Sequence, residues 1–169
     1  MLEELGIAAK SASRIMAKLG QNDKNKALCA VADALIAHAA EVMAANKIDL
    51  KNAADNGMSE ALQDRLRLTE DRFSDMATGV RQVAALEDPI GEVISMKERP
   101  NGLLIGQKRV PMGVIGIIYE SRPNVTVDAF ALCFKTGNAV ILRGGSDCIH
   151  SNIALVKVIK DALLSCDVT

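Results

Sequence analysis

The sequence predicts an α/β fold in which helices come first, an antiparallel β-ribbon follows, and the chain then enters a parallel sheet. Three observations support this order. Residues 1–90 carry apolar side chains at helical spacing, residues 92–110 hold two strand-like runs, and residues 113–143 hold two apolar strands joined by a helical stretch. Apolar strands linked by a helical crossover are typical of parallel sheets.

Two apolar stripes predict the first helices. The first stripe has steps of three or four residues, ends before Gly20, and consists of Leu5, Ala8, Ala12, Ile15 and Leu19. The second has similar spacing, can be capped by Asn22 or Asp23, and consists of Leu28, Val31, Leu35, Ala39 and Val42. We expect these two helices to pack as an antiparallel pair.

Three further segments have helical signals. Helical character continues weakly to Asp55-Asn56-Gly57, which predicts a stop, and Ser59 is placed to cap a short helix that runs to Leu66. Thr69 can cap a longer helix, which Asp88-Pro89 follows. We expect one face of that helix to be buried through Phe73, Met76, Val80 and Val83.

A β-hairpin is predicted in the middle of the chain. Residues 92–99 and 103–110 are strand-like and flank Pro100-Asn101-Gly102, and Asn-Gly between two such runs is a strong hairpin signal. Only half of each run is apolar. We therefore expect the ribbon to reach away from the core or to meet a partner.

The last third predicts a βαβα unit. Strand 113–119 precedes a helix that ends near Gly137, and strand 138–143 precedes Gly144-Gly145 and a helix to about Leu164. The first strand is expected to be buried. Because two parallel strands are too few to bury both faces of a sheet, and the chain ends where a third strand should follow, we expect this to be the beginning of a larger protein.

Composition limits the class of protein. Hydrophobic residues make up 49%, charged residues 24%, and the net charge is -1, which is typical of a globular protein and unlike a nucleic-acid-binding surface. No run reaches the roughly 18 to 20 apolar residues of a membrane span, and Glu3 and Glu4 stand where a signal peptide would be basic. We expect a cytoplasmic protein that binds neither nucleic acid nor membranes.

The cysteines and histidines show no metal or disulfide pattern. There is no Cys-x-x-Cys pair among Cys29, Cys133, Cys148 and Cys166. His38 is expected at the surface. His150 is a weak candidate for a ligand-binding residue because it is near the Gly-Gly turn. We expect mostly buried, reduced thiols and no metal site, and no base accompanies Cys133 to make it a nucleophile.

Polar side chains follow both predicted parallel strands at their carboxyl ends, where open α/β sheets bind ligands. Residues 120–124 (ESRPN) follow the first strand, and residues 143–146 (RGGS) follow the second. The Gly144-Gly145 turn could approach a phosphate closely, and Arg143 could bind a phosphate or ribose. A plain tight turn is the other interpretation, because no G-x-G-x-x-G fingerprint follows either strand.

The loop after the first strand also has two interpretations, which spacing does not separate. In one, Asn124 or Ser121 caps the next helix and Arg122 pairs with Glu120. In the other, Arg122 binds an anion and Asn124 donates its amide to a developing oxyanion.

Several segments resemble the gamma-glutamyl phosphate reductase family, which belongs to the aldehyde dehydrogenase superfamily. The two most specific are residues 109–126 (RVPMGVIGIIYESRPNVT) and 135–146 (KTGNAVILRGGS). Three shorter ones fit the family in the same order, namely residues 44–49, 64–68 and 89–91. The resemblance covers nearly all of the chain and implies N-terminal helices, a β-ribbon and part of the Rossmann-like sheet of that superfamily.

The resemblance also implies a division of the chain. Residues 1–90 would be the helical part of the cofactor-binding domain, and residues 91–110 the ribbon of an oligomerisation region. Residues 111–169 would form the first βαβα of the NADP-binding Rossmann-like domain. The catalytic domain, with the cysteine that forms a thioester and receives the hydride, would lie beyond this chain, so we expect these 169 residues alone to be inactive.

The family's reaction is the reduction of L-glutamyl 5-phosphate by NADPH to L-glutamate 5-semialdehyde and phosphate, in proline biosynthesis. The resemblance therefore implies an oxidoreductase and a homo-oligomer. It leaves open an association with the glutamate kinase that supplies the substrate. Two alternatives remain: a non-catalytic nucleotide-binding or assembly module, and another acyl or aldehyde reductase of the same superfamily.

Site roles follow from the resemblance residue by residue. Arg122 would bind substrate and Asn124 would be the oxyanion donor, although Ser121 aligns nearly as well. Cofactor contacts would come from Tyr119, Glu120, Ser121, Arg143, Gly144, Gly145 and Ser146. Many relatives carry a glutamate at the last position, which would repel the additional phosphate of NADP. Ser146 removes that charge and Arg143 can pair with the phosphate, so we expect a preference for NADPH.

Overall fold

The computed structural model describes residues 2–168 and confirms the α/β class, with helices first, then a ribbon, then a βαβα unit. The helices are α1 (Leu2–Met16), α2 (Gln21–Ala37), α3 (Ala39–Asp55), α4 (Glu60–Leu66), α5 (Glu70–Ala85), α6 (Asn124–Lys135) and α7 (Ile149–Leu164). The strands are β1 (Val93–Glu98), β2 (Leu104–Lys108), β3 (Val114–Ile118) and β4 (Ala139–Arg143), and a 3₁₀ turn, η1, spans Ser146–Cys148.

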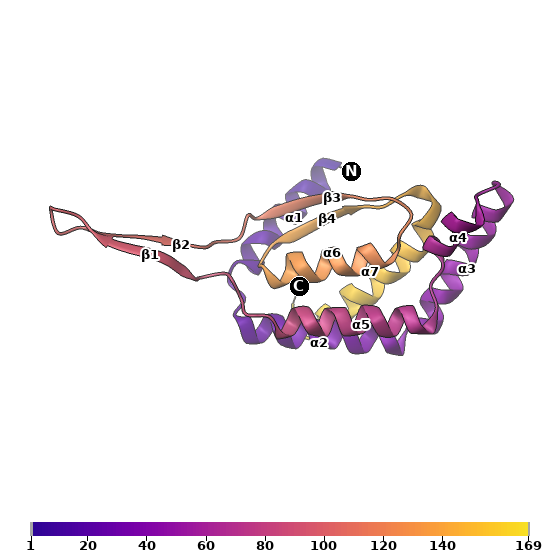
Figure 1. Ribbon diagram of the computed structural model, residues 1–169, viewed down its shortest axis with the longest axis horizontal. Coiled ribbons are helices and arrows are strands. Elements are labelled where there is room, and N and C mark those ends of the chain that lie inside the picture. The colour runs from indigo at the N-terminus through magenta and orange to yellow at the C-terminus, as the bar shows by residue number, and fades with distance from the viewer. Residues whose placement is uncertain (1, 169) are drawn as a thin grey trace.

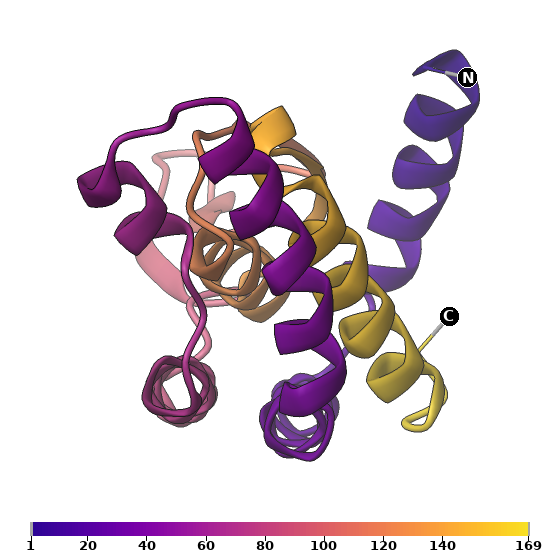
Figure 2. The ribbon, with the colours of Figure 1, turned by 90° about the vertical axis from the view of Figure 1, so that its right-hand side faces the viewer.

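The elements stack in layers (Figure 1). Strands β3 and β4 form one layer, α6 and α7 lie beneath them, and α2 and α5 lie beneath those helices. Figure 2 shows α3 beside α7, while α1 stands apart from the helical layers. The main core lies between the helical layers and includes Leu28, Val31, Phe73, Val127 and Leu155, all almost fully buried.

The predicted antiparallel pairing of the first two helices is wrong. Helix α1 packs on β3 and β4, whereas α2 packs on α5 and α7. The apolar stripe of α1 is not its buried face, because Leu5 and Ile15 are exposed and the buried positions are Ala9, Ser13 and Met16. Helical spacing defines a stripe, but which stripe is covered depends on what the fold places beside the helix.

The second predicted stripe spans two helices. It begins on α2 and crosses His38, where the axes of α2 and α3 meet at 65°. Gly20 is the N-cap of α2, and Asp23 accepts a hydrogen bond from the Gly20 N–H at 3.3 Å. Asp23 thus takes part in capping, although it is not itself the N-cap that the sequence suggested.

The ends of the next helices agree with the prediction. Helix α3 ends at Asp55 and Gly57 has φ of +71°, a conformation that favours glycine. Thr69 caps α5 by accepting a hydrogen bond from the Arg72 N–H at 3.3 Å. Ser59 is the N-cap of α4, but its side chain makes no capping hydrogen bond.

The predicted hairpin is confirmed. Strands β1 and β2 pair antiparallel, with Lys97 opposite Ile105, and every residue of both strands is exposed. Gly102 in the turn has φ of +79°. The ribbon projects from the rest of the molecule (Figure 1), as its half-apolar pattern predicted.

Strands β3 and β4 pair in parallel, with Ile118 opposite Arg143, which confirms the predicted βαβ arrangement. The expectation that the first strand is buried is wrong. Within β3 the side chains are half-buried or exposed, and Ile118 is 83% exposed. The reason is that α1 and α6 cover the two-stranded sheet only in part.

Within residues 2–168 no single helix is long and apolar enough to cross a membrane, and α2 and α3 meet that test only as a bent pair. Among the same residues, no group of three or more His, Cys, Asp or Glu side chains is arranged to hold a metal ion.

Candidate functional site

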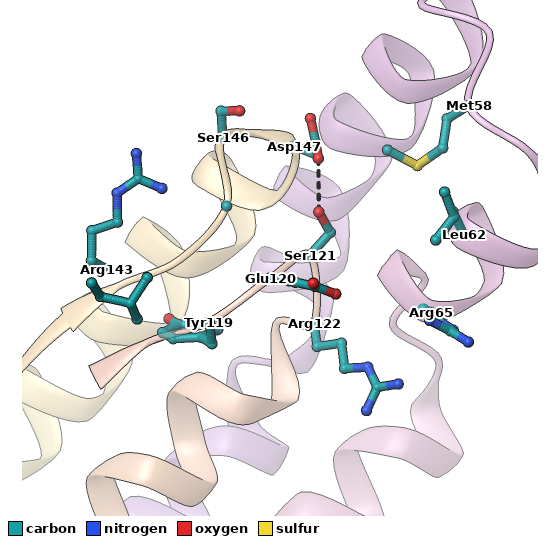
Figure 3. A pocket seen from close by; sticks show the side chains of 12 residues that line it. Met58, Leu62, Arg65, Tyr119, Glu120, Ser121, Arg122, Arg143, Ser146 and Asp147 are labelled. Atoms are coloured by element: carbon teal, nitrogen blue, oxygen red, sulfur yellow. Dashed lines mark hydrogen bonds between the residues drawn. The ribbon is translucent and has the colours of Figure 1, made fainter.

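The carboxyl ends of β3 and β4 meet, as the parallel pairing requires. The Tyr119 N–H donates to the Arg143 carbonyl at 3.1 Å, which continues the ladder by one residue past the strands. The two polar segments that follow these strands therefore lie side by side (Figure 3). Residues separated by more than twenty positions in sequence thus share one end of the sheet.

Gly144 and Gly145 allow this close approach. A Cβ on Gly144 would lie 2.2 Å from the Asn152 amide nitrogen and 3.1 Å from the Tyr119 ring. A Cβ on Gly145 would lie 3.2 Å from the Ser121 hydroxyl oxygen. The structure thus gives the Gly-Gly pair a role in packing the two loops together, beyond the phosphate approach suggested by the sequence.

A hydrogen bond also joins the loops. The Ser121 hydroxyl donates to the Asp147 carboxylate at 2.7 Å (Figure 3). The Arg122 N–H donates to the Glu120 carbonyl at 2.8 Å, which turns the chain sharply after β3. The ion pair between Arg122 and Glu120 that one interpretation predicted does not form among the described residues.

Tyr119 is fixed by a buried chain of hydrogen bonds. The Thr126 hydroxyl donates to the side-chain Oδ1 of Asn152 at 2.9 Å, and the side-chain Nδ2 of Asn152 donates to the Cys148 sulfur at 3.2 Å. Since the single Thr126 proton is already used, the Tyr119 hydroxyl is the donor in its 2.6 Å bond to Thr126. Burial raises the pKa of Tyr119, so the phenol stays protonated in this donor role.

A cleft of about 530 Å³ opens beside the two loops. Its walls come from α4 and the turn before it as well as from both strand ends (Figure 3). The lining residues are Met58, Leu62, Arg65, Ile118, Tyr119, Glu120, Ser121, Arg122, Arg143, Gly145, Ser146 and Asp147. This volume lies within the range of small-molecule sites, which is roughly 300 to 1,000 Å³.

Most residues predicted for the cofactor gather in this cleft. Gly144 does not line the cleft but packs against Asn152 and the Tyr119 ring. Arg122 is also in the cleft wall, but Figure 3 shows that it extends toward Arg65, away from Arg143. The arginines therefore place positive charge on two sides of the cleft, with Arg143 on one side and Arg65 and Arg122 on the other. The Glu120 carboxylate also lines the cleft.

Asn124 does not line this cleft. It is the first residue of α6 and lines a neighbouring cavity of about 400 Å³, where its amide lies 3.5 Å from the Asp128 carboxylate. The two cavities share Arg65 and Arg122. The candidate oxyanion donor is thus next to the cleft rather than inside it.

The predicted helix cap by Asn124 or Ser121 is wrong. Pro123 is the N-cap of α6 and makes no side-chain capping bond, while Ser121 bonds to Asp147. Neither of these two side chains therefore caps the start of α6.

The thiols show no sign of activation. Burial raises the pKa of Cys133 and of Cys148, which favours the neutral thiol. Cys29 is exposed and Cys166 is half-buried, so the expectation of mostly buried thiols holds for only two of the four. Among the cysteines that the structure describes, none lines the cleft.

The two histidines have structural partners. His38 is exposed at the α2–α3 junction and lies 3.4 Å from Glu41. His150 Nδ1 lies 2.7 Å from the buried Asp49 carboxylate, which also accepts hydrogen bonds from the backbone N–H groups of His150 and Ser151. Asp49 thereby caps the start of α7 from another helix, and His150 points to this cap.

Sequence reasoning missed the contribution of the α3–α4 turn and α4. Met58, Leu62 and Arg65 lie more than fifty residues before the strand ends that they face. Charge alone did not single out Arg65 among the other exposed basic residues. Asp147 could have been found from its place directly after the Gly-Gly-Ser turn.

No family model matches the chain. A gamma-glutamyl phosphate reductase from Lachnospira eligens is 64% identical over 162 residues, which cover 96% of this chain and 39% of the relative. The crystal structure of gamma-glutamyl phosphate reductase from Thermotoga maritima superposes with a TM-score of 0.95 at 43% identity, over 97% of this chain and 40% of that one. The chain thus spans about 40% of the length of the relatives it matches.

A more distant likeness shows the fold. The structure of an NAD-dependent benzaldehyde dehydrogenase from Corynebacterium glutamicum has a TM-score of 0.68 at 19% identity, and the match covers 92% of this chain and 32% of that one. The arrangement of helices, ribbon and βαβα unit is therefore that of the N-terminal portion of the aldehyde dehydrogenase fold.

Proposed function

Because the chain is a homologue of the N-terminal part of gamma-glutamyl phosphate reductases, we propose that it belongs to an enzyme that reduces L-glutamyl 5-phosphate with NADPH. The products are L-glutamate 5-semialdehyde and phosphate, and the pathway is proline biosynthesis. One observation carries the proposal: the polar ends of β3 and β4 enclose a single cleft. In this proposal the chain supplies the cofactor site and part of the substrate site.

The cleft has the chemistry that a phosphorylated nucleotide requires. Arg143 is exposed and, among the described residues, its guanidinium makes one hydrogen bond, to the Gly144 carbonyl at 3.1 Å. Its other N–H groups are available for the additional phosphate of NADP. The exposed Ser146 hydroxyl lies in the same cleft and adds no negative charge there, which supports the preference for NADPH.

Asn124 is the better of the two candidates for the oxyanion donor. The Ser121 hydroxyl proton is used in a 2.7 Å bond to Asp147, whereas the Asn124 amide makes only a 3.5 Å contact with Asp128. An oxyanion donor must have an N–H or O–H that is not already used in a short hydrogen bond, and of the two side chains only Asn124 meets this condition. Arg122, which lines both cavities, is proposed to bind the anionic substrate between them.

Two measurements test the proposal. The purified chain is titrated with NADPH and NADH, with Arg143→Ala as the variant and Arg14→Ala, an exposed arginine on α1, as the control. We expect Arg143→Ala to weaken NADPH binding about tenfold, equal to about 1.4 kcal/mol, and to leave NADH binding unchanged. An undiminished preference for NADPH in Arg143→Ala contradicts the assignment of Arg143.

A non-catalytic binding module is the second candidate, because no thiol among the described cysteines lines the cleft. An assay of acyl-phosphate reduction separates the two. We expect no turnover by the chain alone, since we place the nucleophilic cysteine outside it. Turnover by these 169 residues would contradict that placement.

The ribbon is proposed to serve oligomerisation. Its exposed apolar side chains include Val93, Met96, Leu104 and Ile105, and they have no cover from the rest of the described chain. A cytoplasmic location and an association with glutamate kinase remain predictions.

A further inference from the structure

The cavity that holds Asn124 is lined by charges of both signs. It lies between the α4–α5 connection and the first turns of α6, and it has a volume of about 400 Å³. Its cationic side chains are Arg65, Arg67, Arg72 and Arg122, and its anionic side chains are Asp64, Asp75 and Asp128. A binding site for a simple anion would not require the three carboxylates.

One cation and one anion of this set are already paired. Arg72 lies 3.1 Å from the Asp64 carboxylate, and it also donates to the backbone carbonyls of Asp64 and Arg67. These bonds tie the start of α5 to the end of α4 and build one wall of the cavity. Arg72 and Asp64 are therefore structural.

The other charged groups are free to bind a ligand. Among residues 2–168, no ion-pair partner is present for Arg67, Arg122, Asp75 or Asp128. Asp128 has only the long contact with the Asn124 amide. Desolvation raises the pKa of Asp128, and the Asn124 amide is the only group that offsets part of this rise.

The cavity opens onto the cofactor cleft, because Arg65 and Arg122 line both. A molecule held here would reach toward the ends of β3 and β4. L-glutamyl 5-phosphate carries a carboxylate and an ammonium group at one end and the reacting acyl phosphate at the other. Its amino-acid end thus matches a cavity with unpaired guanidinium and carboxylate groups.

We propose that this cavity binds the α-amino acid end of the substrate. Arg67 and Arg122 receive the α-carboxylate, Asp128 receives the α-ammonium, and the acyl end points to the cofactor cleft. This inference rests on the proposed function. It adds a reason for substrate choice, since an aldehyde or acyl phosphate without an amino-acid head would form none of these charge-assisted hydrogen bonds.

Three small probes test the inference on the 169-residue chain by calorimetric titration. L-glutamate 5-methyl ester has both head groups, monomethyl glutarate lacks the ammonium, and methyl 4-aminobutanoate lacks the carboxylate. We expect the first to bind at least about tenfold more tightly than either of the others. Equal affinities for the three probes, or no binding of the first, would overturn the inference.

Two variants assign the groups. Arg67→Ala should weaken L-glutamate 5-methyl ester and monomethyl glutarate about tenfold and leave methyl 4-aminobutanoate unchanged. Asp128→Asn should weaken only the two probes that carry an ammonium. Arg14→Ala is the matched control, and variants that bind all three probes as this control does would overturn the assignment.

The outcome is separable from that of the proposed function. NADPH binding without head-group selectivity would contradict this inference and would still support the cofactor site. Head-group selectivity without NADPH binding supports the inference and contradicts the cofactor assignment. If a variant fails to fold, the three probes on the unmodified chain still decide between selectivity and its absence.

Discussion

At the scale of single residues, the site depends on atoms that make close contact across the two strand ends. Gly144 allows Tyr119 and Asn152 to approach the backbone, and Thr126 links these two side chains by hydrogen bonds. Polar groups buried in this way are stabilising only when each has a partner. No buried side-chain nitrogen or oxygen lacks one in the part of the chain that the structure describes.

Gly144→Ala should destabilise the protein by about 2 kcal/mol, because the added Cβ would meet the Asn152 amide at 2.2 Å. The change is measured as the free energy of unfolding in urea. Gly116→Ala on β3 is the control, since no atom lies within 4 Å of its added Cβ. Equal unfolding free energies for the two variants would show that the loops are not packed as described.

Asp128 should give the stability a specific pH dependence. Its pKa is raised above the usual value of 3.8 by desolvation, and the Asn124 amide offsets part of this rise. The folded state then retains a proton that the unfolded chain releases, so this contribution is full below pH 3.8 and is lost as pH rises through the folded pKa.

Asp128→Asn removes this ionisation, which allows a direct measurement. We expect the variant to gain in unfolding free energy relative to the unmodified protein as pH rises from below 3.8 to neutrality. The gain should be small, because part of the Asp128 side chain reaches solvent. A difference between the two proteins that does not vary with pH would contradict the raised pKa.

At the scale of elements, short-range signals place the helix ends, and long-range contacts orient the helices. Asp49 on α3 caps α7 through the backbone N–H groups of His150 and Ser151. Asn46, one turn earlier on α3, donates to the Leu66 carbonyl and accepts from the Leu68 N–H. One face of α3 therefore fixes both α7 and the end of α4, and so sets one wall of the cleft.

Thr69→Ala should cost about 1 kcal/mol in unfolding free energy, because it removes the side-chain cap of α5. Ser59→Ala is a matched change at the N-cap of α4, where the side chain makes no capping bond. Urea unfolding should show a smaller loss for Ser59→Ala. The opposite order would mean that the cap geometry of α5 does not contribute to stability.

At the scale of the whole molecule, a buried ionic cluster joins the helical part to the βαβα part. Asp88, which follows α5, pairs with the buried Lys24 of α2. Lys135, at the end of α6, donates to Asn25 at 2.7 Å and to the Ala84 carbonyl at 2.8 Å. Burial lowers the pKa of Lys135, and the Asp88 carboxylate counteracts this shift.

Asp88→Asn should destabilise the protein by about 3 kcal/mol at neutral pH, because it leaves two buried ammonium groups without their carboxylate. Glu87→Gln is the control, since Glu87 is exposed and has no ion-pair partner among the described residues. The measurement is again urea unfolding. A loss as small as that of the control would show that other groups neutralise the cluster.

Four features could be predicted from the sequence alone: the order of elements, the hairpin turn at Asn101-Gly102, the cap at Thr69 and the polar ends of the two strands. These features depend on side-chain periodicity and on contacts within a few residues, which the chain shows directly. The resemblance also identified the family to which the relatives belong.

Three other features are visible only in the folded molecule: which face of α1 is buried, that Arg65 faces the end of β3, and that Asn124 lies in a second cavity with Arg67 and Asp128. Each of these depends on contacts between residues far apart in the chain. Such contacts form because helices and strands must cover one another's apolar surface. A local pattern shows which side chains can meet a partner, and packing decides which partner they meet.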